Sequence, residues 1–412
     1  MALEDCMKIF SRTQVLIAVV IEKKDPPILK TPARGDDTRR LHDFTAFPRG
    51  IATIMAARRC PSVVPPAGNT AKALSIFTST GFGSITVPQY VSAVETLRPD
   101  IVVPLADLLY AGSIPVAKKQ LRMAERTEDW VDNFMDLLDA ETRTQGPHMA
   151  VFAPVLAVDH PVQWNYLSHL SEDLADQMEG LAIYDINILP ELTSYKPLGP
   201  LAKLSLDLPS TPHDILRQVS LGVDMILGTF VNSISDAGVA LTFTLPPPEA
   251  AATLGALQPL GVDLWSAEHR MSATPLQDGC PCYACQKHHR AFVNHLLHAK
   301  EMLGWNLLQI HNHHVVDQFF AAIRAALARG GQEELDRVAR LFTTAYEPEL
   351  PPGTGERPRA RGYHFKSEVA QDKYNKPGWQ DLNGGQQSET PVAPEEDSKA
   401  LEAKGFAEKE SK

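Results

Sequence analysis

Three cysteines lie within six residues of one another in the segment Cys280-Pro-Cys282-Tyr-Ala-Cys285. Thiolate sulfur is a preferred ligand of Zn²⁺, which takes four sulfur or nitrogen donors in a tetrahedron with bonds of about 2.0–2.3 Å. The spacing therefore predicts three ligands of one metal ion, and the alternative is a reduced cysteine cluster without metal. Four protein ligands would leave no position for water, which favours a structural role over a Lewis-acid role.

Seven histidines follow the cysteines and offer the fourth ligand: His288, His289, His295, His298, His311, His313 and His314. A helix that begins near His288 would point the first two away from the cysteines. His311 lies near a helix junction predicted at Asn312, so it could fold back on the cluster. The chain has five cysteines, and an odd number with three so close together is unlike a disulfide framework. We therefore expect a reducing compartment.

Short apolar segments alternate with amphipathic stretches upstream of the cysteines, and these elements must position any site. The predicted strands are 74–78, 101–105, 149–158, 180–186, 202–208, 222–227 and 239–245, with 15–21 as an eighth candidate. The predicted helices between them include 88–97, 117–142, 161–178 and 212–221. Strands that alternate with helices pair in parallel through right-handed crossovers. The pattern therefore predicts an α/β fold, a (β/α)₈ TIM-type barrel rather than a doubly wound sheet.

Composition divides the chain into three predicted regions. Residues 1–248 would form the barrel, and 249–345 a connector and a metal-binding helical subdomain, because three consecutive prolines at 246–248 interrupt the strand and helix pattern. Residues 290–329 carry apolar side chains at helical spacings. Residues 346–412 are rich in Pro, Gly, Glu, Lys and Gln, with few large apolar side chains, and predict a disordered tail of mixed charge.

The charge of the chain narrows the possible partners. A formal net charge of −11 should repel polyanions, so RNA binding would need a local basic face or a basic partner. Three arginines in the tail, Arg357, Arg359 and Arg361, could contact phosphate, but a solvated linker is the simpler interpretation. The apolar run 15–21 is about a third of the roughly 20 residues that a membrane helix needs. We expect no membrane-spanning segment and no secretory signal.

Several motifs together resemble the tRNA-guanine transglycosylases. The cysteine segment, with Glu301-Met-Leu-Gly304 and Ile310-His311-Asn312 after it, is similar to the C-terminal zinc segment of that family. Upstream, Leu221-Gly-Val-Asp224-Met-Ile-Leu227 resembles the barrel segment that carries the family's nucleophile. The resemblance implies a (β/α)₈ barrel with an appended zinc subdomain, and one structural Zn²⁺ held by Cys280, Cys282, Cys285 and His311.

The resemblance also implies that the catalytic groups are missing. In active members an aspartate attacks the anomeric carbon of the ribose as guanine leaves. Leu227 occupies that position here and cannot form a glycosyl intermediate. The loop that carries the general acid or base corresponds to 78–83, which contains no carboxylate. Asp107 lies within one residue of the base-binding aspartate and is a candidate vestigial base site, whereas Asp224 would face the opposite side of its strand and pair locally.

This combination is similar to the non-catalytic members of the family. It implies the accessory subunit of a heterodimeric queuine tRNA-ribosyltransferase, which supports tRNA binding while the catalytic subunit exchanges guanine for queuine at the wobble position. It further implies a cytoplasmic location, or a peripheral one at the mitochondrial outer membrane, with no integral membrane contact. The alternatives are an active transglycosylase that uses a different carboxylate and a zinc-stabilised interaction scaffold unrelated to tRNA.

Overall fold

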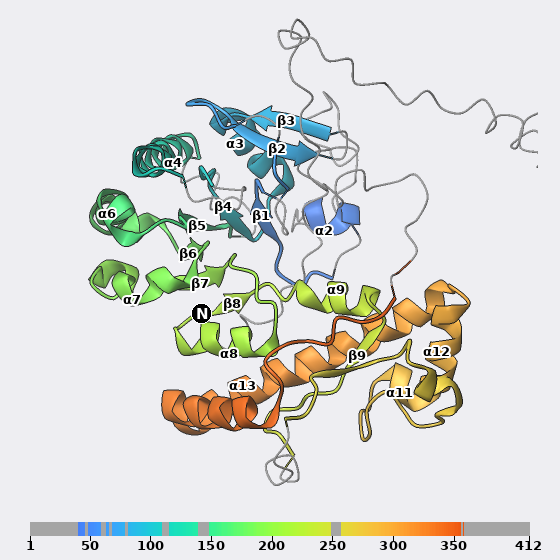
Figure 1. Cartoon of the computed structure of the whole chain (residues 1–412). Helices are drawn as coiled ribbons and strands as arrows, with labels where there is room; N and C mark the ends of the chain where they lie inside the picture. Colours follow the sequence, from blue (N-terminus) through green and yellow to red (C-terminus); the bar gives the residue numbers. More distant parts are fainter. Residues whose placement is uncertain are drawn as a thin grey trace, which may run out of the picture. The chain divides into compact units, whose positions relative to one another are not determined.

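The computed structural model of the chain describes residues 40–45, 48–58, 63–65, 68–78, 81–108, 115–138, 148–248, 257–355 and 357. Its strands are β1 (Ile54–Ala56), β2 (Leu74–Thr78), β3 (Gly81–Ile85), β4 (Ile101–Val103), β5 (Ala150–Val155), β6 (Gly180–Ile183), β7 (Ala202–Ser205), β8 (Met225–Ile226), β9 (Val239–Leu241) and β10 (Gly261–Asp263). Its α-helices are α2 (Arg40–Thr45), α3 (Val87–Leu97), α4 (Ala117–Leu137), α6 (His160–His169), α7 (Leu189–Leu192), α8 (Pro212–Ser220), α9 (Phe230–Asp236), α11 (Tyr283–Lys287), α12 (Arg290–His298) and α13 (Met302–Ala345). Strands and helices alternate through the first part, and helices dominate the second (Figure 1).

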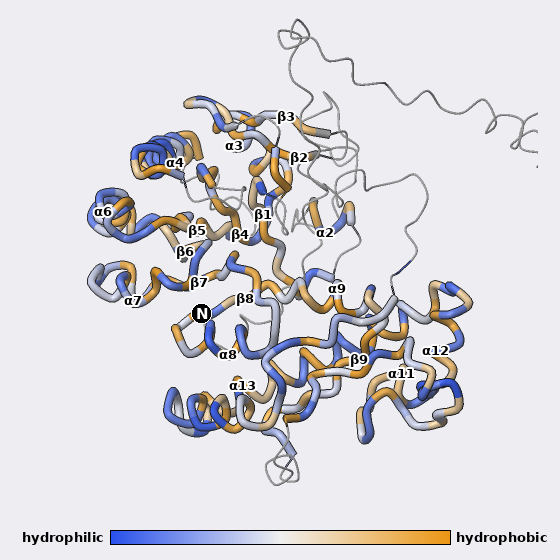
Figure 2. The backbone as a smooth tube through the Cα atoms, viewed as in Figure 1, coloured by the Kyte–Doolittle hydropathy of each residue, from blue (hydrophilic) through white to orange (hydrophobic). Residues whose placement is uncertain are grey.

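Six strands form one parallel sheet in the order β1-β4-β5-β6-β7-β8, and this sheet curls like half a barrel (Figure 1). The side chains of one face form a buried cluster made of Ile101, Val103, Phe152, Ala182, Leu204, Leu206, Met225 and Leu227. Alternate residues, among them Leu181 and Ile226, pack on the other face with side chains of α6 and α8. Both faces of the strands are thus apolar, as parallel sheets require (Figure 2). The α/β class and the parallel pairing are confirmed.

Two segments predicted as barrel strands pair elsewhere. The first, β2, forms an antiparallel hairpin with β3, and the second, β9, pairs antiparallel with β10. A hairpin with so short a connection satisfies the backbone groups of β2 locally, so β2 does not join the parallel sheet. The described part of the chain therefore shows six barrel strands rather than eight. The other predicted strand, 15–21, lies outside the described residues.

The helix break predicted at Asn312 is wrong. The break lies at residues 299–301, where Lys300 adopts a positive φ of 57°, and α13 continues without interruption through Asn312. A second discontinuity occurs at Gly330 and Gly331, where the backbone leaves the helical conformation and Gly331 has φ 58°. Although α13 is 44 residues long, no helix in the described part of the chain is long and apolar enough to cross a bilayer.

The first residues of the predicted tail pack against the body of the protein. Tyr346 is 4% exposed, and its hydroxyl accepts a hydrogen bond from the Thr244 amide at 3.1 Å. Arg357, which composition assigns to a solvated cluster, forms an ion pair of 3.2 Å with Asp236. The well-packed chain therefore extends about ten residues beyond the predicted boundary. Residues 358–412, with Arg359 and Arg361, lie outside the described residues.

Helices α4 and α6 are joined by a histidine between two carboxylates. His169 Nε2 lies 2.7 Å from Asp132 of α4, and its Nδ1 lies 2.9 Å from Asp173. Burial opposes the charged imidazole, but the hydrogen bonds with the two carboxylates outweigh it and raise the pKa of His169. A raised pKa in the folded state stabilises the fold below about pH 6.5, and the contribution is lost as the pH rises through the folded-state value.

The variant His169→Gln should therefore be less stable than the wild type at pH 6, by up to about 1 kcal/mol because the pair is partly exposed. The difference should narrow at pH 8.5. Urea unfolding at both pH values measures it, with His160→Gln as the control, since His160 bonds the Tyr195 hydroxyl and not a carboxylate. A difference of equal size at both pH values would contradict the assignment.

Candidate metal centre

The three cysteines and His311 converge on one point. His311 Nδ1 lies 3.7, 3.5 and 3.4 Å from the sulfur atoms of Cys280, Cys282 and Cys285. All four ligand atoms lie within 4.8 Å of one another. A tetrahedron with metal–sulfur bonds of about 2.3 Å and a metal–nitrogen bond of about 2.05 Å requires sulfur–nitrogen distances of about 3.6 Å. The four side chains therefore fit a tetrahedral metal ion.

Local structure explains how three cysteines so close in sequence can face one centre. Cys282 caps the N-terminus of α11, and its sulfur accepts a hydrogen bond from the Cys285 amide at 3.4 Å. Cys285 lies one turn along the same short helix, so both sulfurs face the same side. Gly279 has a φ of 74°, which glycine adopts readily. The turn at this residue precedes Cys280, whose sulfur is the third of the cluster.

His311 is oriented by the neighbouring strand. Its Nε2 contacts the Leu241 carbonyl at 2.8 Å, and because a carbonyl can only accept, Nε2 carries the hydrogen and Nδ1 faces the sulfurs. The next residue, Asn312, accepts from the Leu241 amide at 2.8 Å and donates to the Val239 carbonyl and the Ser235 hydroxyl. Both side chains are fully buried. The metal centre is thus anchored to β9.

These contacts alter the ionisation of the ligands. Burial disfavours a charged Cys282, but hydrogen bonds with His311 and the Cys285 amide outweigh burial and lower the pKa of Cys282 to about 6. Burial also disfavours a charged His311, yet the three sulfur atoms raise its pKa to about 11. The lowered pKa of Cys282 favours its thiolate, which is the form that binds a metal cation, and a bound cation would take the place of the proton that the sulfur atoms favour on His311.

Other basic residues near the cysteines have structural contacts instead. His288 stacks on Phe292 with ring centroids 5.0 Å apart, and His289 accepts a hydrogen bond from the Phe292 amide at the start of α12. Arg290 donates to the carbonyls of Pro275 and Leu276, each at 3.0 Å. Sequence reasoning missed the roles of Arg290 and Asn312. The helical spacing of apolar residues on both sides of position 312 could have indicated that the helix continues there, although it does not indicate the contacts of Asn312 with β9.

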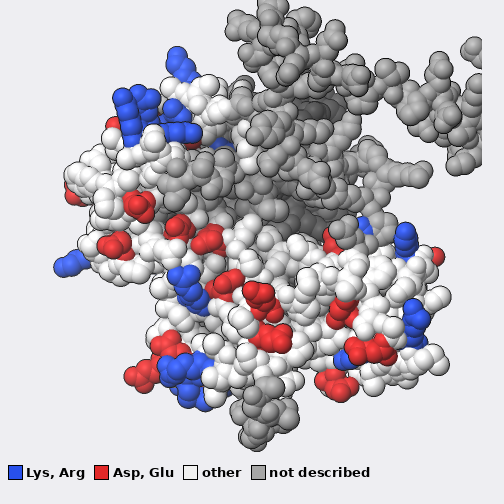
Figure 3. All heavy atoms as spheres, viewed as in Figure 1, with Lys and Arg blue, Asp and Glu red and all other residues white. Residues whose placement is uncertain are grey.

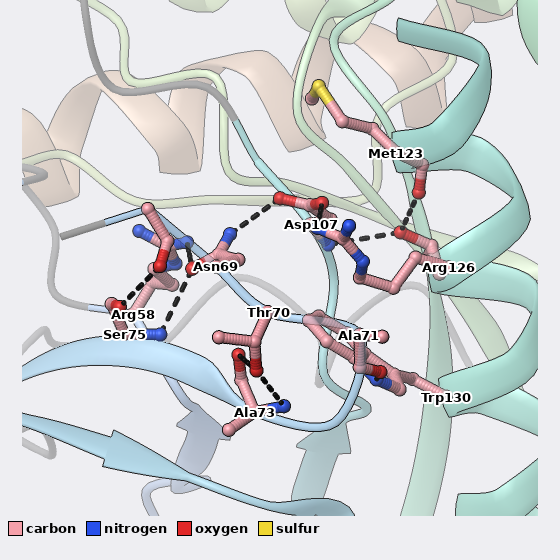
Figure 4. Close-up of polar contacts among 12 residues, drawn as sticks. Arg58, Asn69, Thr70, Ala71, Ala73, Ser75, Asp107, Met123, Arg126 and Trp130 are labelled. Carbon is pink, nitrogen blue, oxygen red and sulfur yellow. Dashed lines mark hydrogen bonds and ion pairs between the residues drawn. The ribbon is translucent and has the colours of Figure 1, made fainter. Parts of the chain in front are cut away.

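Asp107, the candidate base site, is enclosed by the protein's own side chains (Figure 4). One carboxylate oxygen accepts from Asn69 Nδ2 at 2.5 Å, and the other pairs with Arg126 of α4. Arg58 donates to Asn69 at 3.3 Å, and burial lowers the pKa of Arg58 to about 9, so it stays charged at neutral pH. Asp107 is only 5% exposed. Both of its oxygens are therefore already engaged.

Leu227 directly follows β8 and belongs to the buried cluster on the inner face of the sheet. Asp224 lies before β8, at the opposite edge, where its carboxylate accepts from the Lys203 amide at 2.8 Å. Its backbone amide in turn donates to the Lys203 carbonyl at 2.9 Å. Asp224 therefore has the local pairing expected from the sequence, and it is far from the edge at which Leu227 lies.

Two further carboxylates follow β6 and β7 at the edge where Leu227 lies. Asp185 accepts from the Asn187 amide at 2.9 Å, and Asp207 accepts from the Ile186 amide at 3.2 Å. Burial, together with the charge of Asp185, raises the pKa of Asp207. Because Leu206 belongs to the inner cluster and side chains alternate along a strand, Asp207 points toward α8. Both carboxylates therefore bond backbone amides of the loop that follows β6.

A curled parallel sheet followed by helices that bear a Cys₃His cluster defines a barrel-derived α/β protein with a segment whose four side chains could hold a metal ion. The sequence profile of queuine tRNA-ribosyltransferase matches residues 26–345, and the chain belongs to this family.

Several relatives carry the same name, queuine tRNA-ribosyltransferase accessory subunit 2. The protein of Schizosaccharomyces pombe is 33% identical over 344 residues, which cover 82% of this chain and 74% of the relative. The Xenopus laevis protein is 27% identical and covers 68% of this chain and 75% of its own length. The Drosophila pseudoobscura protein is 27% identical over 73% of each chain.

Replacement of one ligand tests the metal centre. Cys282→Ser should lose stoichiometric metal and unfold α11 and α12, because a structural zinc site contributes about 10 kcal/mol or more in small domains. Elemental analysis and far-UV circular dichroism measure the two effects. The control His295→Ala removes an exposed histidine of the same segment and should keep both. Full metal content in Cys282→Ser would refute the ligand assignment.

Proposed function

We propose that this chain is the non-catalytic subunit of a heterodimeric queuine tRNA-ribosyltransferase. It supports tRNA binding while a catalytic partner exchanges guanine for queuine at the wobble position. The observation that carries the proposal is Leu227, an apolar side chain packed in the inner cluster at the position that the resemblance assigns to the nucleophile. Glycosyl transfer through a covalent intermediate requires a carboxylate there.

The surroundings of the remaining carboxylates support the same proposal over an active transglycosylase. Asp107 uses both oxygens on Asn69 and Arg126, so a purine would have to displace a buried ion pair to reach it. Asp185 and Asp207 accept hydrogen bonds from backbone amides of the loop after β6. A general acid or base must be within hydrogen-bond reach of a bound substrate. These carboxylates already form hydrogen bonds or ion pairs with other groups of the protein.

The ligand set favours zinc as the metal. Three thiolates and one imidazole in a closed tetrahedron suit Zn²⁺, which then stabilises the helical segment and takes no part in chemistry. We assign the barrel to residues 1–248, the connector and zinc subdomain to 249–345, and to 346–412 a tail whose first residues, Tyr346 and Arg357 among them, pack on the body. A complete (β/α)₈ barrel would need two strands beyond the six described. A cytoplasmic location agrees with the reduced cysteines of the zinc site.

Apolar side chains around the zinc subdomain offer a surface for the catalytic partner. Tyr283 is 56% exposed, and Met302, Leu303 and Ile310 on α13 are 42%, 46% and 44% exposed. Leu303 and Ile310 are seven residues apart, so they lie on one face of the helix. Contact between large apolar side chains is typical of permanent interfaces. The names of the relatives, which denote an accessory subunit, agree with such a partner.

The first test of this function is chemical. The purified chain should exchange no guanine in tRNA and form no covalent adduct, and exchange should appear when a catalytic homologue is added. Leu227→Asp alone should not restore exchange, because Asp107 remains enclosed by Asn69 and Arg126. Incorporation of labelled guanine measures the activity. A covalent adduct trapped on the wild-type chain alone would overturn the accessory role.

The second test concerns assembly. Light scattering of the chain mixed with the catalytic subunit should give the mass of a heterodimer. Leu303→Asp should weaken the complex at least about tenfold, because a charge would be buried in an apolar contact. The matched control is Leu341→Asp, which changes a 38% exposed leucine in the C-terminal part of α13. Equal affinities for the two variants would argue against an interface at the zinc subdomain.

A further inference from the structure

Basic side chains gather at one end of α4 in an otherwise acidic protein. Lys118, Lys119 and Arg122 are all exposed and lie within two turns at the start of this helix. We call these three residues the α4 basic cluster. Within the described part of the chain, none of their side chains forms an ion pair. Blue side chains accordingly gather in Figure 3 where Figure 1 places α4.

The order of charges along α4 is the reverse of what helix stability favours. Its first half carries the basic residues, its first turn contains no acid and Glu125 is the one acid in that half, whereas Glu128, Asp129, Asp132 and Asp136 lie in its second half. The N-terminus of a helix bears partial positive charge, so lysines in the first turn destabilise it and acids there stabilise it. The α4 basic cluster therefore adds to the positive potential of the helix end, and this combination attracts anions.

The α4 basic cluster also projects beyond the edge of the sheet that Leu227 marks. Arg126 and Thr127 of α4 contact Asp107, just after β4. Lys118 lies eight residues and Arg122 four residues before Arg126, so at 1.5 Å per residue the cluster spans about 6 to 12 Å further out along the helix. The substrates of barrel enzymes approach this carboxyl edge of the strands. The cluster is therefore placed to meet a polyanion that lies across this edge.

Several other described basic side chains are engaged by the protein. Arg329 and Arg337 pair with Glu334, Arg357 pairs with Asp236, and Lys203 donates to backbone carbonyls. An arginine or lysine that is already paired contributes little to the attraction of a second anion. The α4 basic cluster differs because its three charges are close together and available.

An anionic membrane is the other surface that such a cluster could meet, and the structure disfavours it. The apolar residues of α4, including Met123, Ala124 and Trp130, are buried against the protein. Among the described residues from 115 to 122, the large apolar side chains that are exposed beside the cluster are Val116 and Leu121, at 74% and 48%. A helix that lies in the membrane interface needs a continuous apolar face turned outward.

We propose that the α4 basic cluster binds phosphate groups of the RNA backbone, and that this is where the chain contacts the tRNA it presents to the catalytic subunit. The inference rests on the proposed function, since it names residues for the tRNA contact. Each phosphate that a basic residue neutralises releases counterions, so binding through this cluster depends on salt. The contact is to the backbone and therefore does not depend on base sequence.

The test uses the full-length chain in complex with the catalytic subunit and an unmodified tRNA transcript. The triple variant Lys118→Ala, Lys119→Ala, Arg122→Ala should bind about tenfold more weakly at low salt. The slope of log affinity against log salt should become shallower by about 2 to 3, because each phosphate contact contributes about 0.7 to 0.9. The control Lys196→Ala, Lys300→Ala, Arg340→Ala removes the same charge from scattered exposed sites and should match the wild type. Fluorescence anisotropy measures both series.

The outcomes separate this inference from the proposed function. A triple variant that still assembles and supports exchange, but binds tRNA with the wild-type slope, would overturn the site and leave the accessory role intact. Equal losses in the triple variant and the control would also overturn it, because the effect would then come from net charge alone. Loss of binding to phosphatidylserine vesicles with unchanged tRNA binding would replace RNA by a membrane as the partner.

Discussion

The pair His311 and Asn312 on α13 is the contact on which the arrangement of the second half of the chain depends. His311 faces the three cysteines, and Asn312 accepts a hydrogen bond from the Leu241 amide and donates one to the Val239 carbonyl of β9. Because His311 donates to the Leu241 carbonyl, Leu241 bonds both residues, through its carbonyl to His311 and through its amide to Asn312. A buried asparagine or histidine without partners would be strongly destabilising, so these contacts allow a single position of α13 against the strand.

At the carboxyl edge of the sheet, apolar packing and an internal ion pair occupy two positions that the resemblance connects with catalysis. Leu227 adds to the inner apolar cluster where the resemblance implies a carboxylate, and the buried Asp107 is neutralised by Arg126. Neither arrangement leaves a charge unpaired in the interior, which would be costly. The charges on α4 and the apolar residues around α11 and α13, in contrast, are exposed.

The sequence predicted what depends on local spacing and failed where distant segments meet. The three cysteines were predictable because a metal demands close thiolates, and the resemblance singled out His311 among seven histidines. Asn312, with the following His313, predicts a helix break that the structure does not show, because α13 continues through it. Its partners on β9 lie some seventy residues away in sequence and leave no local signal. The pairing of β9 with β10 was missed for the same reason, since no periodicity distinguishes it from a parallel strand.

The glycine pair at 330 and 331 makes α13 a helical hairpin. Phe319 and Phe342 stand on either side of it with ring centroids 5.4 Å apart, whereas 23 residues of straight helix would separate them by about 34 Å. Both rings pack on Phe243. A turn of only two residues cannot absorb an insertion. One residue inserted after Gly331 would rotate the C-terminal part of α13 by about 100° and turn Phe342 away from the other two rings. The number of residues in the turn at Gly330 and Gly331 is therefore as constrained as their identity. Insertions and deletions are expected in other loops.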